Sequence, residues 1–198
     1  MPMKLLPLDR TADADSAPIY DGLTAFADGA LGAAGCALTF DRDKSEELTL
    51  RTVGEVLVVA DALGTTALEV WMDFECNHVY LRVRSPNAQT VEALAGLAHA
   101  CFDVLDRRRV LRAAHRKRRH PRDVARLALV TEGDDDGEVF ALLVDALAPP
   151  DLAARRGALR AMTLLGWPGF VPALEAAEAT VDASLRRAHG DALATCRR

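Results

Sequence analysis

The residues best suited to chemistry in this sequence lie in Asp73-Phe-Glu-Cys-Asn-His78, where carboxylates, a thiol and an imidazole are close together. A nucleophilic cysteine needs a base within hydrogen-bond reach and a neighbour that favours the thiolate. The acids beside Cys76 disfavour the thiolate, and a metal site would need more ligands than Cys76 and His78. We therefore interpret this segment as a polar turn, and we expect no catalytic residue, no bound metal, no cofactor and no enzymatic activity.

Two further patterns resemble ligand-binding motifs only in part. Gly29, Gly32 and Gly35 are three residues apart, but this run follows no predicted strand and lacks the Gly-x-Gly turn of dinucleotide-binding loops. Asp134-Asp-Asp-Gly137 resembles part of a calcium loop but has no bidentate glutamate at the required distance. We interpret the second pattern as a solvated loop between helices.

Residues 107–122, called the basic segment below, carry nine cations within sixteen residues. At helical spacing, the cations at 108, 112, 116 and 119 would share one face. They can pair with acids of the flanking parts, since residues 1–100 have a net charge of −8 and residues 123–198 one of −4. Alternatively they contact phosphates with salt-dependent affinity, although no aromatic residue between them could stack on bases. The candidate binding residues are Arg107, Arg108, Arg109, Arg112, Arg116, Lys117, Arg118, Arg119 and Arg122.

The composition indicates a globular protein of a reducing compartment. Half of the 198 residues are apolar, the net charge is −5, and the four cysteines form no CxxC pair. The sequence has neither a signal-peptide pattern nor an apolar run long enough to span a membrane. We expect free thiols and a cytoplasmic location without membrane contact. A single Ile and three Lys among many Ala and Arg indicate a bacterium with GC-rich codons.

Hydrophobic periodicity predicts the elements that position these residues. Residues 1–17 are aperiodic and predict a flexible arm, residues 19–34 have helical spacing, and residues 36–40 predict a buried strand. The spacing from Ser45 to Leu63 favours a helix, although its valines leave a strand possible. Alternation over 66–84 predicts a hairpin in which Glu69, Asp73 and Glu75 face Arg82 and Arg84. A long helix is expected from Asn87 to about Arg119.

The C-terminal part contains an internal repeat. Asp151-Leu-Ala-Ala-Arg-Arg matches Asp182-Ala-Ser-Leu-Arg-Arg 31 residues later, with Leu-Gly and Val-Pro-Ala-Leu between the two copies. This period resembles that of short HEAT-like repeats, in which paired helices stack into a solenoid. The resemblance covers roughly residues 122–198 and implies a scaffold that binds proteins. It implies that each aspartate caps a helix and that Leu165-Gly166 closes the helix that starts at Asp151. It also makes the paired arginines candidates for a repeat face: Arg155, Arg156, Arg186 and Arg187.

Together these patterns predict a mostly α protein with a small α+β N-terminal part. We expect a flexible arm (1–17), an α+β domain with the hairpin and a long basic helix (18–120), and HEAT-like helical hairpins (121–198). The expected function is non-enzymatic binding of another protein, as an adaptor or as an immunity or chaperone-like partner. The alternative is a nucleic-acid-associated protein that binds phosphates through the basic segment.

Overall fold

The chain is divided into two units, Met1–Leu105 and Asp106–Arg198, and each is described by itself. The computed structural model describes residues 1–12, 14–50, 54–116, 119–131, 136–148 and 151–198. The first unit is mixed α+β, and the described elements of the second are helical. The unit boundary falls at residue 105 and not at 120, because the basic segment packs with the C-terminal helices.

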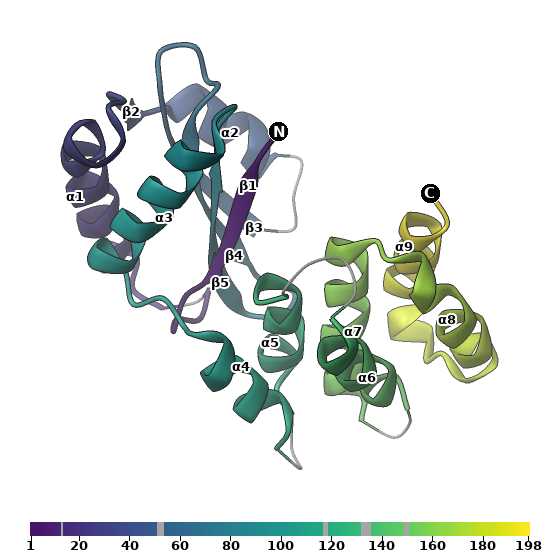
Figure 1. Cartoon of the computed structure of the whole chain (residues 1–198). Helices are drawn as coiled ribbons and strands as arrows, with labels where there is room; N and C mark the ends of the chain where they lie inside the picture. The colour runs from purple at the N-terminus through teal and green to yellow at the C-terminus, as the bar shows by residue number, and fades with distance from the viewer. Residues whose placement is uncertain (13, 51–53, 117–118, 132–135, 149–150) are drawn as a thin grey trace. The chain divides into compact units, whose positions relative to one another are not determined.

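The first unit is built on one antiparallel sheet of five strands in the order β1-β5-β4-β3-β2 (Figure 1). The predicted hairpin is confirmed as β4 (Ala67–Asp73) and β5 (His78–Arg84). β3 (Gly54–Ala60) pairs with β4, and the short β2 (Thr39–Phe40) pairs with β3. The expected strand at 36–40 is thus only two residues long, and both residues are exposed.

The N-terminal residues differ from the flexible arm expected for 1–17. β1 (Met3–Pro7) is an edge strand that pairs with β5, with Met3 opposite Arg84. Leu6 and Leu8 are buried in the core and hold this short segment against the sheet. The prolines beside them in the sequence favour a loop, and for this reason the strand was not expected. Further on, the Ala12 N–H donates to Asn77 Oδ1 at the hairpin turn.

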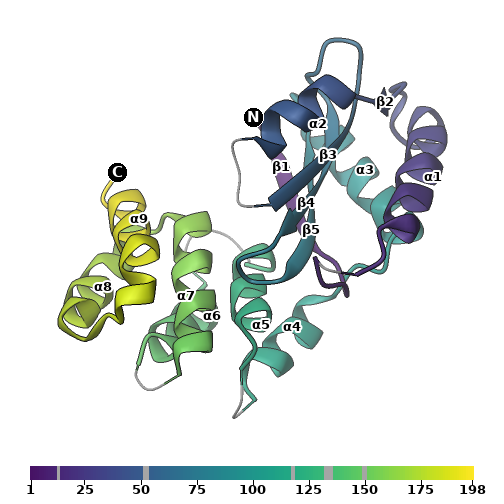
Figure 2. The same ribbon diagram turned by 180° about the vertical axis from the view of Figure 1, so that it is seen from behind.

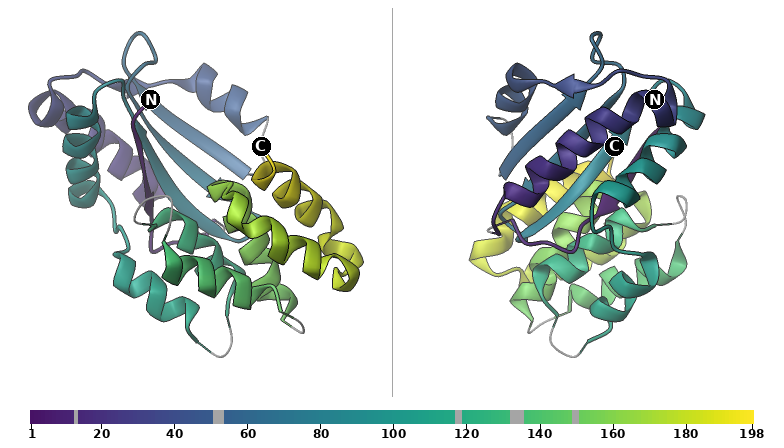
Figure 3. Two further views of the ribbon diagram at one scale, coloured as in Figure 1. Left: turned by 45° about the vertical axis from the view of Figure 1, so that its right-hand side comes forward. Right: turned by 90° about the vertical axis from the view of Figure 1, so that its left-hand side faces the viewer.

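Two helices cover one face of the sheet (Figure 3, left). α1 (Ala17–Ala34) confirms the predicted helix and ends at Gly35, whose φ of 67° is left-handed. α3 (Ala88–Cys101) packs beside it, and both bury apolar side chains against the strands. The helices approach closely at Gly22, where an added Cβ would lie 2.5 Å from the Phe102 ring.

The helix favoured over residues 45–63 is right only up to Thr49, and the alternative strand is right for residues 54–60; residues 51–53 lie outside the described residues. The chain forms α2 (Arg42–Thr49), capped by the Asp41 side chain, and then β3. β-branched residues prefer the pleated sheet, which explains the change. α2 lies on the opposite face of the sheet from α1 and α3 (Figure 2). Its Ser45 and Thr49 hydroxyls accept hydrogen bonds from the edge N–H groups of Val58 and Val56 at 2.9 and 3.0 Å.

The predicted continuous helix from residue 87 to 119 is also wrong. α3 ends at Cys101, and α4 (Arg107–Ala114) starts anew with the Asp106 side chain as its cap. Between them the chain is extended, because Val104 bridges Leu8 and the Leu105 N–H donates to the Pro7 carbonyl. Tertiary pairing therefore overrides a helical pattern at this point.

The second unit is a set of packed helices. α7 (Leu152–Leu165) is central and contacts α5 (Pro121–Ala125), α6 (Gly137–Ala146) and α9 (Arg186–Cys196). α8 (Val171–Ala177) packs on α9, and short 3₁₀ turns complete the unit: η1 (Arg126–Leu129), η2 (Pro168–Phe170), η3 (Glu178–Thr180) and η4 (Ala183–Leu185). The Asp151 and Asp182 side chains cap the following turns, and Gly166 ends α7 with φ of 63°. Those three local predictions are confirmed.

Candidate functional site

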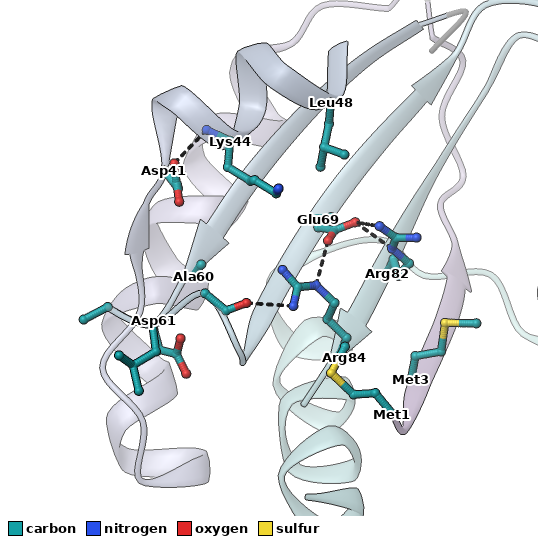
Figure 4. Close-up of a pocket in the computed structure, with 13 residues that line it drawn as sticks. Met1, Met3, Asp41, Lys44, Leu48, Ala60, Asp61, Glu69, Arg82 and Arg84 are labelled. Carbon is teal, nitrogen blue, oxygen red and sulfur yellow. Dashed lines mark hydrogen bonds and ion pairs between the residues drawn. The ribbon is translucent and has the colours of Figure 1, made fainter. Parts of the chain in front are cut away.

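A buried carboxylate organises the face of the sheet opposite α1 and α3, called the second face below. Glu69 on β4 has a side chain only 1% exposed and lies opposite Arg82 on β5. It accepts hydrogen bonds from Arg82 Nε at 2.6 Å and Arg84 Nε at 2.9 Å (Figure 4). A third hydrogen bond comes from Trp71 Nε1 at 2.9 Å. Of the three acids expected to face these arginines, Glu69 does so, whereas Asp73 lies opposite His78 and Glu75 is in the turn.

The two guanidinium groups are held in fixed positions. Arg84 Nη1 also donates to the Gly64 carbonyl at 2.8 Å. The Arg82 guanidinium lies 4.8 Å from the centre of the Trp71 ring, which stacks on Tyr80 with centroids 6.0 Å apart. Because two guanidinium groups surround one carboxylate, this cluster has one surplus positive charge and N–H groups that point away from Glu69.

A pocket of about 760 Å³ lies over this cluster, entirely within the first unit (Figure 4). Its floor is polar, but three strongly exposed apolar residues stand at its rim: Met1 at 70%, Met3 at 59% and Leu63 at 85%. The side chains that line it come from β1, α2, the β3–β4 turn, β4 and β5: Met1, Met3, Asp41, Lys44, Leu48, Ala60, Asp61, Ala62, Leu63, Glu69, Arg82 and Arg84. This second-face pocket can therefore bind a ligand with both apolar and acidic groups.

The Asp41 and Asp61 carboxylates of the pocket accept hydrogen bonds from neighbouring residues of the protein. Asp41 accepts the Lys44 N–H, and Lys44 Nζ pairs with Glu47 at 2.9 Å. Burial acts to raise the pKa of Asp61, but hydrogen bonds from Thr65 and Thr66 outweigh it and hold that pKa below its usual value. These carboxylates stabilise a helix start and a turn, and are not arranged as an acid–base pair.

The Cys76–His78 candidate is brought together at the hairpin turn, but inside the protein. His78 Nε2 lies 3.4 Å from Asp73 Oδ2, and the Cys76 N–H donates to Asp73 Oδ1. Both His78 and Cys76 are at most 2% exposed, so a substrate has no access to them. Asn77 takes a positive φ of 51° and binds the Ala12 N–H. Among the residues that the structure describes, no three His, Cys, Asp or Glu side chains are placed to share a metal ion.

The basic segment is divided by its contacts. Arg107 forms a two-pronged pair with Asp136, Arg119 pairs with Asp145 at 2.6 Å, and Arg122 lies 3.7 Å from Asp123. These three cations hold the second unit together, as the pairing interpretation expects. Lys117 and Arg118 lie outside the described residues. The remaining candidates are exposed: Arg108, Arg109, Arg112 and Arg116.

The four repeat-face arginines are not equivalent. Arg155 is buried at 3% exposure and donates to the Leu147 carbonyl and to Thr180, so it cannot belong to a binding face. Its role is to tie α7 to the ends of two neighbouring segments. Arg156, Arg186 and Arg187 are exposed.

Sequence reasoning found Glu69, Arg82 and Arg84 as a strand pair but missed the pocket above them. The sequence places Met1 and Met3 in an expected flexible arm and Leu63 near the end of an expected helix. Residues 3–7 have no alternating pattern that indicates an edge strand, because only Lys4 among them is polar.

No family model, no curated protein and no solved structure matches this chain. Within the described residues, none of the helices has the length and apolar character needed to cross a bilayer.

Proposed function

We propose that this protein is a non-enzymatic interaction module that binds a segment of another protein in the second-face pocket. The observation that carries the proposal is the placement of exposed Met1, Met3 and Leu63 around the fixed guanidinium groups of Arg82 and Arg84. Arginine is over-represented among the residues that dominate binding energy at protein interfaces. Methionine adapts to the shape of an apolar partner.

The chemistry of the pocket defines the segment that it would bind. An apolar side chain would cover Met3 and Leu63 and remove their surface from water. An adjacent Asp or Glu would receive the guanidinium N–H groups that point away from Glu69. A short peptide stretch with one acidic and one or two large apolar residues satisfies both requirements.

The second unit is proposed to be a short HEAT-like array that supports this binding. The helix caps at Asp151 and Asp182 and the left-handed Gly166 support it, as does Arg155, which joins the end of α6 to Thr180. The exposed Arg156, Arg186 and Arg187 are its candidate contact residues. A bacterial cytoplasmic adaptor, or an immunity or chaperone-like partner, is the class of protein that combines such features.

The test is affinity capture from native lysate with the full chain, with and without nuclease. We expect one stoichiometric protein that nuclease does not remove. Replacing both rim residues, Met3→Glu with Leu63→Glu, should reduce its capture at least about tenfold, since about 1.4 kcal/mol of binding corresponds to that factor. Leu31→Glu on α1 is the matched control, because Leu31 is also exposed, at 62%, but lies outside the pocket. Equal capture by the rim variant and the control would exclude the pocket as the binding site.

A further inference from the structure

The exposed arginines of the basic segment gather on one side of α4. With 3.6 residues per turn, Arg108, Arg109 and Arg112 fall within an arc of about 100°, and Arg116 follows on the same side just past the helix. The buried residues of α4, Val110 and Ala114, lie on the opposite side. We call Arg108, Arg112 and Arg116 the α4 arginine face.

This face differs from the rest of the basic segment in its contacts. Arg107 and Arg119 are each within 3.3 Å of an acidic oxygen. Over the residues that the structure describes, no carboxylate lies within ion-pair distance of Arg108, Arg112 or Arg116. The fold therefore uses some of these cations for its own stability and leaves a row of others in solvent.

We infer that the α4 arginine face binds the phosphate backbone of a nucleic-acid duplex. Residues four apart on a helix are separated by about 6 Å along its axis, so Arg108, Arg112 and Arg116 form a row of guanidinium groups. Each group can donate two parallel hydrogen bonds to a phosphate. α4 carries only Arg, Val, Leu and Ala, so it has no aromatic side chain that could stack on an unpaired base. Backbone contact independent of base sequence is what this chemistry permits.

The site belongs to the second unit and shares no residue with the second-face pocket. Binding of a duplex through α4 can therefore be tested independently of the proposed peptide binding.

The test measures binding of the full chain to a labelled DNA duplex of about 20 base pairs by fluorescence anisotropy as salt is raised. Contact with three phosphates gives a slope of log affinity against log salt of about −2.7, which is a loss of about 40-fold between 50 and 200 mM salt. Arg108→Glu with Arg112→Glu should weaken binding at least about tenfold at 50 mM and flatten the slope. The matched control, Arg197→Glu with Arg198→Glu, changes the net charge equally on exposed residues elsewhere in the unit and should change affinity less than about twofold.

Three results would overturn the inference. One is an absence of duplex binding at the lowest salt concentration. The second is equal loss of affinity in the control variant, which would mean that net charge and not the α4 arginine face is responsible. The third is competition by polyglutamate as effective as competition by unlabelled duplex, which would identify an acidic protein segment as the ligand. Unchanged thermal unfolding of the Arg108 and Arg112 variant would confirm that the loss is not one of folding.

Discussion

Replacing the buried Arg155 by methionine tests what holds the second unit together. Arg155 Nε donates to the Leu147 carbonyl at 2.8 Å, Nη1 to the Thr180 carbonyl at 2.7 Å, and Nη2 to Thr180 Oγ1 at 2.9 Å. One side chain thereby connects α7 with the end of α6 and with the turn after α8. Methionine has a similar length but no donor, so the substitution removes these bonds with little change in packing volume.

The magnitude follows from the burial of each acceptor. A hydrogen bond to a charged group contributes about 1.5–3 kcal/mol. Thr180 is exposed, so water replaces its lost donors at small cost. Leu147 is 4% exposed, and its carbonyl loses a partner that water does not readily replace. We expect Arg155→Met to lower the free energy of unfolding of the second unit by about 2–3 kcal/mol.

The assay uses the two tryptophans, one in each unit: Trp71 and Trp167. In a Trp71→Phe background, Trp167 fluorescence reports unfolding of the second unit in urea. The expected loss lowers the urea midpoint by roughly 1–2 M. Arg156→Met is the control, since this neighbouring arginine is exposed and should change stability by less than about 0.5 kcal/mol. Equal midpoints for the two variants would refute the role assigned to Arg155.

Three further perturbations address the first unit, a helix contact and the dependence on pH. Glu69→Gln should destabilise the first unit by about 1–3 kcal/mol, because two half-buried guanidinium groups lose their shared carboxylate; unchanged urea unfolding followed by Trp71 would contradict this. Gly157→Ala places a Cβ 2.3 Å from the Pro121 carbonyl oxygen and should lower stability by about 1–3 kcal/mol. Gly190→Ala meets no atom within 4 Å and should raise it by about 0.5–1 kcal/mol, so similar thermal shifts for the two would be a contradiction. The Asp61 carboxylate has a lowered pKa, so it stabilises the folded state at pH values above the usual pKa of about 3.9. This stabilisation is lost as pH falls through the lower pKa of the folded state. A difference in stability between Asp61→Asn and the parent that does not shrink in acid would contradict this.

The sequence predicted elements whose signals are local. Strict alternation predicts the β4–β5 hairpin and places acids on the face of Arg82 and Arg84, but it does not distinguish Glu69, which pairs with them, from Asp73 and Glu75. Asp151 and Gly166 were assigned correctly as helix start and end because cap chemistry involves only a few neighbouring residues.

The errors occurred where distant residues decide the conformation. Residues 102–105 have helical spacing with their neighbours, yet Pro7 and Leu8 hold them in an extended form. The second-face pocket was missed for the same reason, since Met3, Lys44 and Arg84 meet only after five strands have been placed in order. The hydrophobic pattern of a short sequence segment does not specify the order of the strands in the sheet.

The outer edge of β1 leads to a final prediction about what prevents another chain from pairing with this strand. The Pro2 carbonyl and the Leu8 N–H bond to β5, so the backbone groups of Met3 and Leu5 point away from the sheet. Such an edge can pair with another chain, and a lysine in an edge strand opposes this because its charge must lose water. Lys4, which pairs with Glu92 at 2.6 Å, is the charged residue between them.

Lys4→Val should therefore increase self-association, measured by sedimentation velocity over a range of protein concentrations. The lost surface ion pair itself contributes only about 0–1 kcal/mol, so folding should persist. Lys44→Val on α2 removes the same charge away from the edge and should leave the sedimentation profile as in the parent protein. If both variants sediment like the parent, Lys4 does not protect the edge. If Lys4 prevents backbone pairing at the β1 edge, a partner is selected by the side chains of the second-face pocket and not by the exposed backbone of β1.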